Sequence, residues 1–202
     1  MDIEYEAKFA NINKDEIRAR LKRAGAKLTQ PETLQRRTVF YFPAGHEIEG
    51  AWLRVRDEGN KVTMSIKTAG TEIADQKEIM LVIDSYGRAV SFLQYLGCKE
   101  RGQAESKREW WELDGTEVTI DEWPFLEPFV EIEGKSEAAV REISERLGFD
   151  WAQAVFGSTH LLNTKKYGIP EDALNNEIPH ITFAGPNPYQ AWLDTHQPDK
   201  RQ

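Results

Sequence analysis

Three charged side chains alternate along the first strand-length run of the chain, from Ile3 to Phe9. They are Glu4, Glu6 and Lys8. Because alternate residues of a β-strand point to the same face, both carboxylates and the ammonium group share one face of this run. Paired carboxylates could hold a divalent cation, and a neighbouring ammonium could hold an anion. Taken alone, such a strand is most simply a solvated edge, so the later strands decide between these readings.

The same alternation recurs in five later runs, each with one apolar and one charged face. The charged faces add Asp121, Glu131 and Glu133 to an acidic group, and place Arg54, Arg56, Lys67 and Arg108 in a basic group. An antiparallel sheet with one solvated face is the simple alternative. We favour a charged interior, because arginine and paired glutamate stand where lysine, threonine and serine usually solvate a sheet. Helices on the apolar faces would then leave the charged faces to line a closed barrel.

A cavity with such walls has a definite chemical preference. Clustered carboxylates stay ionised together only with a cation, and hard ions such as Mg²⁺ or Mn²⁺ prefer oxygen ligands. The sequence contains no cluster of Cys or His residues that would compete for zinc. Guanidinium groups suit phosphate oxygens, with which they form bidentate, charge-assisted hydrogen bonds. A polyphosphate bound as its metal complex would satisfy both groups.

Alternating strands and amphipathic helices supply the frame for these residues. Besides the first run, strands are expected at residues 34–42, 51–57, 61–68, 77–81, 106–113, 117–121 and 129–133. Helices are expected at 14–24, 85–96 and 137–147, with Asn13, Asp84 and Ser136 as N-caps. Turn signals at Gly59-Asn60 and Asp114-Gly115 favour antiparallel hairpins. The expected fold is an α+β domain of about eight strands with helices packed outside the sheet.

Length and composition exclude several classes of protein. A chain of 202 residues, 40% of them hydrophobic, fits one domain plus an appendage. No apolar run is long enough to span a bilayer and no signal-peptide pattern precedes the first strand, so we expect a cytoplasmic protein without a membrane partner. The net charge of -8 argues against binding of nucleic acid. The single cysteine, Cys98, excludes an internal disulfide framework.

The order of these motifs resembles the CYTH superfamily, the triphosphate tunnel metalloenzymes. The run Glu4-Tyr5-Glu6-Ala7-Lys8 is similar to the family's ExExK signature. The later motifs follow in order: Leu53-Arg54-Val55-Arg56, Met64-Ser65-Ile66-Lys67, Glu78, Arg108, Asp121 and Val130-Glu131-Ile132-Glu133. The resemblance implies an eight-stranded antiparallel β-barrel with helices outside, forming a triphosphate tunnel with one or two divalent metal ions. We expect this tunnel domain at residues 1–169 and a C-terminal tail of unknown role at 170–202, with one short helix around residues 189–194.

The resemblance also implies roles for individual residues. The metal-facing acids would be Glu4, Glu6, Asp121, Glu131 and Glu133, and the substrate-binding residues Lys8, Arg54, Arg56, Lys67, Glu78 and Arg108. Of these, Glu4, Glu6, Lys8 and Glu131 would be catalytic. The chain departs from the family at Gln76 and Met80, where an Arg and a Glu are common. It also has Ser158-Thr159-His160 where many members carry a basic residue, for which Lys165 or Lys166 could substitute.

Two further expectations concern single residue types. Only one of Arg36 and Arg37 can face inward, because they are adjacent on one strand, and a weak internal repeat that matches Arg36 to Arg108 favours Arg36. The four histidines lack metal-ligand spacing and are expected on the surface or in packing roles.

The activity that the resemblance implies is phosphoryl transfer to water inside the tunnel. The expected enzyme is a Mg²⁺- or Mn²⁺-dependent hydrolase of inorganic triphosphate or of a small organic triphosphate, such as thiamine triphosphate or a nucleotide. Two alternatives stay open: a class IV adenylate cyclase that makes cyclic AMP from ATP, and a non-catalytic polyphosphate binder. The small-molecule triphosphate is the expected partner, and a homodimer is left open.

Overall fold

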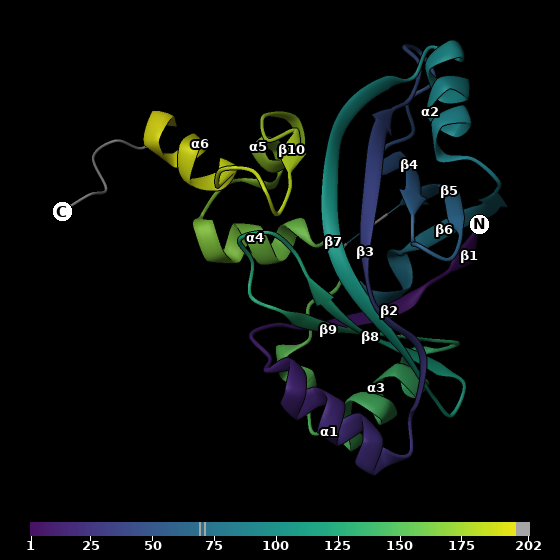
Figure 1. Ribbon diagram of the computed structural model, residues 1–202, viewed down its shortest axis with the longest axis vertical. Helices are drawn as coiled ribbons and strands as arrows, with labels where there is room; N and C mark the ends of the chain where they lie inside the picture. The colour runs from purple at the N-terminus through teal and green to yellow at the C-terminus, as the bar shows by residue number, and fades with distance from the viewer. Residues whose placement is uncertain (69, 71, 197–202) are drawn as a thin grey trace.

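Nine of the ten strands in the described part of the chain wind into one nearly closed antiparallel barrel (Figure 1). The computed structural model describes residues 1–68, 70 and 72–196. Around the barrel the strands follow the order β1, β6, β5, β4, β3, β7, β8, β9, β2. Their bounds are β1 Asp2–Ile3, β2 Tyr5–Phe9, β3 Lys27–Tyr41, β4 Ala51–Asp57, β5 Val62–Thr68, β6 Lys77–Ile83, β7 Lys99–Leu113, β8 Thr116–Glu122 and β9 Phe129–Gly134.

The N-terminal run closes the barrel because it is divided between the two edges of the sheet. β1 pairs with β6 and β2 pairs with β9, and Glu4 lies between the two pieces. The Glu4 N–H donates to the carbonyl oxygen of Gln76 at 2.9 Å, which keeps the junction joined to β6. This division explains why nine barrel strands are found where the sequence predicted eight. The predicted antiparallel barrel is confirmed.

Three helices cover the apolar faces of the barrel strands. They are α1 Lys14–Ala24, α2 Tyr86–Tyr95 and α3 Glu137–Arg146, and a 3₁₀ turn, η1 Ile73–Asp75, precedes β6. The predicted N-caps Asn13 and Ser136 are confirmed, because both side chains accept from backbone N–H groups of the first turn. The predicted cap Asp84 is wrong: Ser85 accepts from the Arg88 N–H instead. A one-residue error of this kind arises because Asp and Ser both cap well.

The apolar core lies between the barrel wall and these helices, so the charged strand faces point inward. Below the barrel in Figure 1, Leu21 of α1 and Val140 of α3 pack with Ile132 of β9 in one cluster. On another side, Leu93 of α2 packs with Val55 of β4. This arrangement explains how charged residues such as Glu6 and Lys8 can each be only 2% exposed. The strands bury both faces, one against helices and one around the interior.

The C-terminal segment, residues 157–196, packs along β7. It contains α4 His160–Tyr167, α5 Glu171–Asn176, β10 His180–Ile181 and α6 Pro188–His196, preceded by the 3₁₀ turn η2 Trp151–Gln153. The predicted helix around residues 189–194 is confirmed by α6, whereas α4, α5 and β10 were not predicted. β10 pairs in parallel with β7, and Gly102 permits the approach because a Cβ there would lie 2.6 Å from the Pro179 carbonyl oxygen. No helix among the described residues is long and apolar enough to cross a membrane.

Candidate functional site

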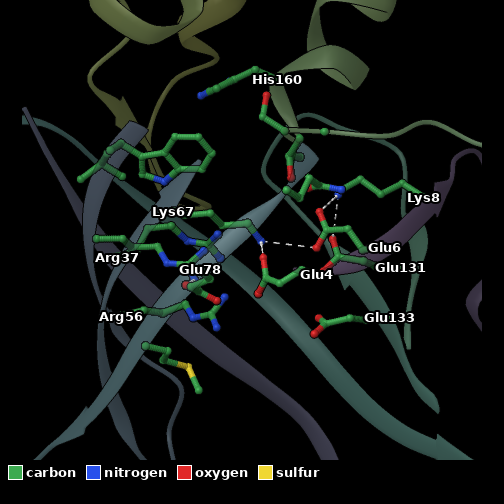
Figure 2. Close-up of a pocket in the computed structure, with 18 of the residues that line it drawn as sticks. Glu4, Glu6, Lys8, Arg37, Arg56, Lys67, Glu78, Glu131, Glu133 and His160 are labelled. Atoms are coloured by element: carbon green, nitrogen blue, oxygen red, sulfur yellow. Dashed lines mark hydrogen bonds and ion pairs between the residues drawn. The ribbon is translucent and has the colours of Figure 1, made fainter. Parts of the chain in front are cut away.

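The barrel encloses one charged cavity of about 540 Å³. Ten of the residues expected at the site line it: Glu4, Glu6, Lys8, Arg54, Arg56, Lys67, Glu78, Arg108, Glu131 and Glu133. Figure 2 shows Glu6, Glu131 and Glu133 on one side of this cavity, Arg37 and Arg56 on the opposite side beside Glu78, and Lys67 reaching between them. The predicted segregation of the two charges is therefore only partial in space, because Glu78 lies with the arginines and Lys8 and Lys67 lie with the carboxylates.

The acidic wall is the side of the cavity that holds Glu6, Glu131 and Glu133. The antiparallel pairing of β2 with β9 brings these residues together. Glu6 lies opposite Glu133, and Lys8 lies opposite Glu131. One carboxylate oxygen from each of Glu6, Glu131 and Glu133 falls within 4.8 Å of the other two. These three carboxylates suit a hard divalent cation, because the ligands are all oxygens and three negative charges converge on one point.

Two lysines lie within this acidic wall and offset part of its charge. Lys8 forms a buried ion pair with Glu6, and its Nζ lies 3.4 Å from Glu131. Lys67 extends from β5, and its Nζ lies 2.7 Å from Glu4 and 3.4 Å from Glu6. Burial would lower the pKa of Lys8, but Glu131 and Glu6 more than offset this, so its pKa is raised and the ammonium stays charged.

The basic wall holds four arginines from three neighbouring strands, three of them buried and Arg56 partly buried, and three of the four have carboxylate partners. The Nη2 atoms of Arg54 and Arg56 lie 2.8 Å from Glu78 and Glu58. Arg108 Nε lies 2.7 Å from Asp121, and its Nη2 lies 3.1 Å from Glu131. These pairs hold the guanidinium groups in place while their remaining N–H groups can face the cavity.

The fourth, Arg37 on β3, has no carboxylate partner among the described residues. Its Nη2 donates to Gln35 and Ser106, and its guanidinium lies 4.3 Å from the centre of the Trp123 ring. Its Nε is buried without a hydrogen-bond partner. Burial and the nearby arginines, first among them Arg56, hold the pKa of Arg37 well below its usual value. A buried, uncompensated guanidinium is costly, so this position favours a bound anion.

Comparison with known proteins assigns the family of this site. The CYTH domain family matches residues 2–152. The chain belongs to the CYTH family. No curated protein matches the chain. The expected family is therefore confirmed, and the matched residues span the whole barrel.

Solved structures show the same CYTH fold. A conserved hypothetical protein from Pyrococcus furiosus is 21% identical, with a TM-score of 0.65 over 79% of this chain and 99% of that chain. A protein described as a putative adenylate cyclase, from Vibrio parahaemolyticus, is 14% identical, with a TM-score of 0.69 over 81% and 98%. A putative adenylyl cyclase from Hippeastrum, described as having a dominant triphosphatase activity, is 15% identical, with a TM-score of 0.54 over 85% and 99%.

Two residues implied by the CYTH resemblance do not line the cavity. Asp121 is fully buried behind the wall, where it accepts hydrogen bonds from Arg108 Nε and from Thr119 Oγ1 at 2.6 Å. It therefore orients Arg108 from behind. Lys165 is exposed on α4, outside the residues that line the cavity. Its neighbour Lys166 donates to the carbonyl oxygen of Phe125 and pairs with Glu127.

The preference for Arg36 over Arg37 is wrong. The Arg36 side chain is 65% exposed and pairs with Asp57 on the outside, whereas Arg37 lines the cavity. Alternate residues of a strand share one face, so Arg37 faces inward together with Gln35 and Val39. The weak internal repeat that matched Arg36 to Arg108 does not reflect the direction of these side chains. Because Val39 is apolar, the inward face of β3 does not stand out in the sequence as a run of alternating charged residues.

Sequence reasoning also missed other polar residues that line the cavity, among them Glu58, Arg101, Glu117 and His160. Glu58 could have been found, because it continues the inward parity of Arg54 and Arg56 just past the end of β4. Arg101 lies in a polar part of β7 that shows no alternation. His160 lies beyond the part of the chain that matches the CYTH domain, and it was expected on the surface or in packing.

A pH-dependent stability is expected from Glu133. Burial, and next the charge of Glu6, raise its pKa to about 7 from an ordinary 4.5. Stability from the protonated carboxyl is then fully present below pH 4.5 and lost as the pH rises through about 7. In a chelator, the melting temperature should fall between pH 5 and 8, by roughly 2–4 °C for each kcal/mol lost. The substitution Glu133→Gln should flatten this fall.

The flattening should be partial, because burial also raises the pKa of Glu4, to about 8. Glu142→Gln is the matched control, since this glutamate is exposed on α3, and it should leave the pH profile unchanged. An identical fall in Glu133→Gln and in the parent protein would contradict the assignment.

Proposed function

We propose that the chain is a divalent-metal-dependent triphosphatase, a hydrolase of inorganic triphosphate or of a small organic triphosphate. One observation carries this proposal. The carboxylates of Glu6, Glu131 and Glu133 converge on one side of a cavity, and its other side holds Arg37, which has no carboxylate partner among the residues that the structure describes. A polyphosphate complexed with a cation is complementary to both sides. The Hippeastrum structure described as a triphosphatase has the same fold.

The acidic wall would hold the metal ion through Glu6, Glu131 and Glu133. Such an ion, most simply Mg²⁺ or Mn²⁺, neutralises charge on phosphate oxygens and makes a bound water more acidic. A carboxylate of this wall takes the proton of the attacking water.

The basic wall binds the phosphate chain and stabilises the charge that develops during transfer. Arg37, Arg54 and Arg56 lie on adjacent strands and donate toward the same space. Lys8 and Lys67 lie where the two walls meet, so they can donate to the phosphoryl group under attack. Apart from Arg37, these donors are already ordered by ion pairs, which reduces reorganisation in the transition state.

Two other activities fit parts of this site. A class IV adenylate cyclase would use the same walls to place a ribose hydroxyl against the α-phosphate of ATP, and the Vibrio structure is described as a putative adenylate cyclase. A non-catalytic polyphosphate binder is favoured by Gln76 and Met80, which line the cavity where the family often has an Arg and a Glu.

Turnover assays separate these three activities. Tripolyphosphate, thiamine triphosphate and ATP are each incubated with Mg²⁺ or Mn²⁺, and orthophosphate, pyrophosphate and cyclic AMP are measured. A triphosphatase releases orthophosphate from at least one substrate and forms no cyclic AMP. Equimolar pyrophosphate and cyclic AMP from ATP would instead establish a cyclase. Tight binding of tripolyphosphate without turnover in either metal would leave only the binder.

A further inference from the structure

One end of the cavity is formed by the C-terminal segment, and none of its polar groups has a role in the proposed hydrolysis. Ser158, Thr159 and His160 line the cavity there, together with Arg101 of β7 and Glu171 of α5. In Figure 2, His160 lies above the arginines and away from the carboxylates. This end is distinct from the acidic wall, because its residues lie on β7 and in the C-terminal segment, whereas Glu6, Glu131 and Glu133 lie on β2 and β9.

Three groups at this end lack the partners that buried polar groups normally have. Arg101 is half-buried, and no hydrogen bond or ion pair is found for its guanidinium among the described residues. Nδ1 of His160 is buried and has no hydrogen-bond partner among the described residues. The same is true of Nε of Arg37. Arg37, Arg101 and His160 line the same cavity, and burial, followed by the charges of Arg101 and Arg37, lowers the pKa of His160 to about 4, so its imidazole is neutral.

The first turn of α4 adds a further attraction for an anion. The side chain of Thr159 at the N-cap makes no capping hydrogen bond, and the cavity lining includes residues 157–160 at the start of this helix. The Leu161 and Leu162 N–H groups already donate to the Ser158 and Thr159 carbonyl oxygens, so this helix N-terminus attracts an anion through the helix dipole and not through those two donors. Glu171, which accepts from Ser158 at 2.8 Å, is the acidic group that lines this end. Two arginines and a helix N-terminus outweigh it.

We propose that Arg37, Arg101, His160 and the first turn of α4 form a second anion subsite, which binds a phosphoryl group beyond the three held between the acidic and basic walls. The inference rests on the proposed function, because those walls must hold the first three phosphoryl groups. The subsite extends the range of ligands to polyphosphates of four or more phosphoryl groups. Orthophosphate released by hydrolysis has the same chemistry and could occupy the same place.

Calorimetric binding without metal tests the subsite, because no turnover is then required. Tripolyphosphate and tetrapolyphosphate are titrated into the parent protein and into Arg101→Gln. The substitution should weaken tetrapolyphosphate binding about tenfold or more, since a charge-assisted contact is lost, and tripolyphosphate binding by less than about threefold. Equal losses for both ligands would overturn the subsite, because Arg101 would then belong to the triphosphate walls. No loss for either ligand would overturn it as well.

Three further variants sharpen the test. His160→Asn retains a polar atom near the position of Nδ1 and should bind tetrapolyphosphate more tightly than His160→Ala. Glu171→Gln removes a repelling carboxylate but keeps an acceptor for Ser158, so it should strengthen tetrapolyphosphate binding. Lys99→Gln is the matched charge control, because Lys99 is exposed on β7 and does not line the cavity. A loss in Glu171→Gln would contradict the proposal.

The origin of the bound phosphoryl group is resolved by adding orthophosphate to the complex with tripolyphosphate. Binding of orthophosphate that disappears in Arg101→Gln would assign the subsite to the released product as well as to longer chains. If the parent protein binds neither polyphosphate, with or without the divalent metal, the proposed function and the subsite both fail. If it binds both with equal affinity and all variants match it, the subsite alone fails.

Discussion

Replacing Glu131 with Gln is expected to lower metal-dependent turnover by about 100-fold or more and to raise the metal concentration needed for half-maximal activity. The side chain is 8% exposed and contributes one oxygen to the cluster with Glu6 and Glu133. Gln is nearly the same size, so the change removes charge with little effect on packing. Assays of kcat across a range of Mg²⁺ or Mn²⁺ concentrations measure both effects.

The same substitution should also destabilise the protein, and this must be separated from the loss of activity. Glu131 lies 3.4 Å from Lys8 and 3.1 Å from Arg108, and these cations hold its pKa below the ordinary value despite its burial. Removing one member of a buried ion pair typically costs about 3–5 kcal/mol, because the remaining charge is left uncompensated. Assays should therefore be made well below the melting temperature of the variant.

Asp121→Asn is the informative comparison for Glu131→Gln. Asp121 contacts Arg108 from behind the wall and does not line the cavity. The variant should raise KM for the triphosphate, because Arg108 loses its orientation, without changing the metal requirement. If Asp121→Asn raises the metal requirement as much as Glu131→Gln does, Asp121 is a metal-facing acid, as the family resemblance implied, and its placement as a positioning residue is wrong.

The interior of the barrel was predictable because its strands alternate between apolar and charged residues. One face of each strand is buried against helices and the other lines the cavity. In β9, Val130 and Ile132 pack outward, whereas Glu131 and Glu133 face inward. The helices impose an apolar requirement on one face, and the cavity imposes a charged one on the other. Alternation shows which face a residue lies on, but it does not show which residues of two neighbouring strands lie opposite each other. The sequence could not show that Glu6 lies opposite Glu133, although this pairing brings the three carboxylates together.

The C-terminal segment was poorly predicted for a different physical reason. α5 has six residues and β10 has two, so neither is long enough to show a periodic pattern. Both are stabilised by contacts that are distant in sequence, such as Ile181 beside Ala104 of β7. The contribution of His160 to the cavity depends on this docking. Local sequence patterns cannot report a site that is assembled from remote segments.

Replacing Arg37 with Gln is expected to stabilise the ligand-free protein and to weaken triphosphate binding by about 10- to 100-fold. The side chain is 8% exposed, and Arg54, Arg56 and Arg108 surround it without a compensating carboxylate of its own. A neutral Gln removes this repulsion and the cost of burying the charge. A gain of about 1 kcal/mol would raise the melting temperature by roughly 2–4 °C. The same charge is favourable once a polyanion lies in the cavity.

Arg36→Gln separates this local effect from a general change in net charge. Both variants remove one positive charge from β3, but Arg36 is exposed and its ion pair with Asp57 lies at the surface, where such pairs contribute roughly 0–1 kcal/mol. Melting temperature and tripolyphosphate affinity should therefore stay near the parent values in Arg36→Gln. Opposite signs for stability and affinity in Arg37→Gln would establish that the fold keeps this arginine at an energetic cost for its ligand. A variant that loses stability and keeps its affinity would show that Arg37 is structural.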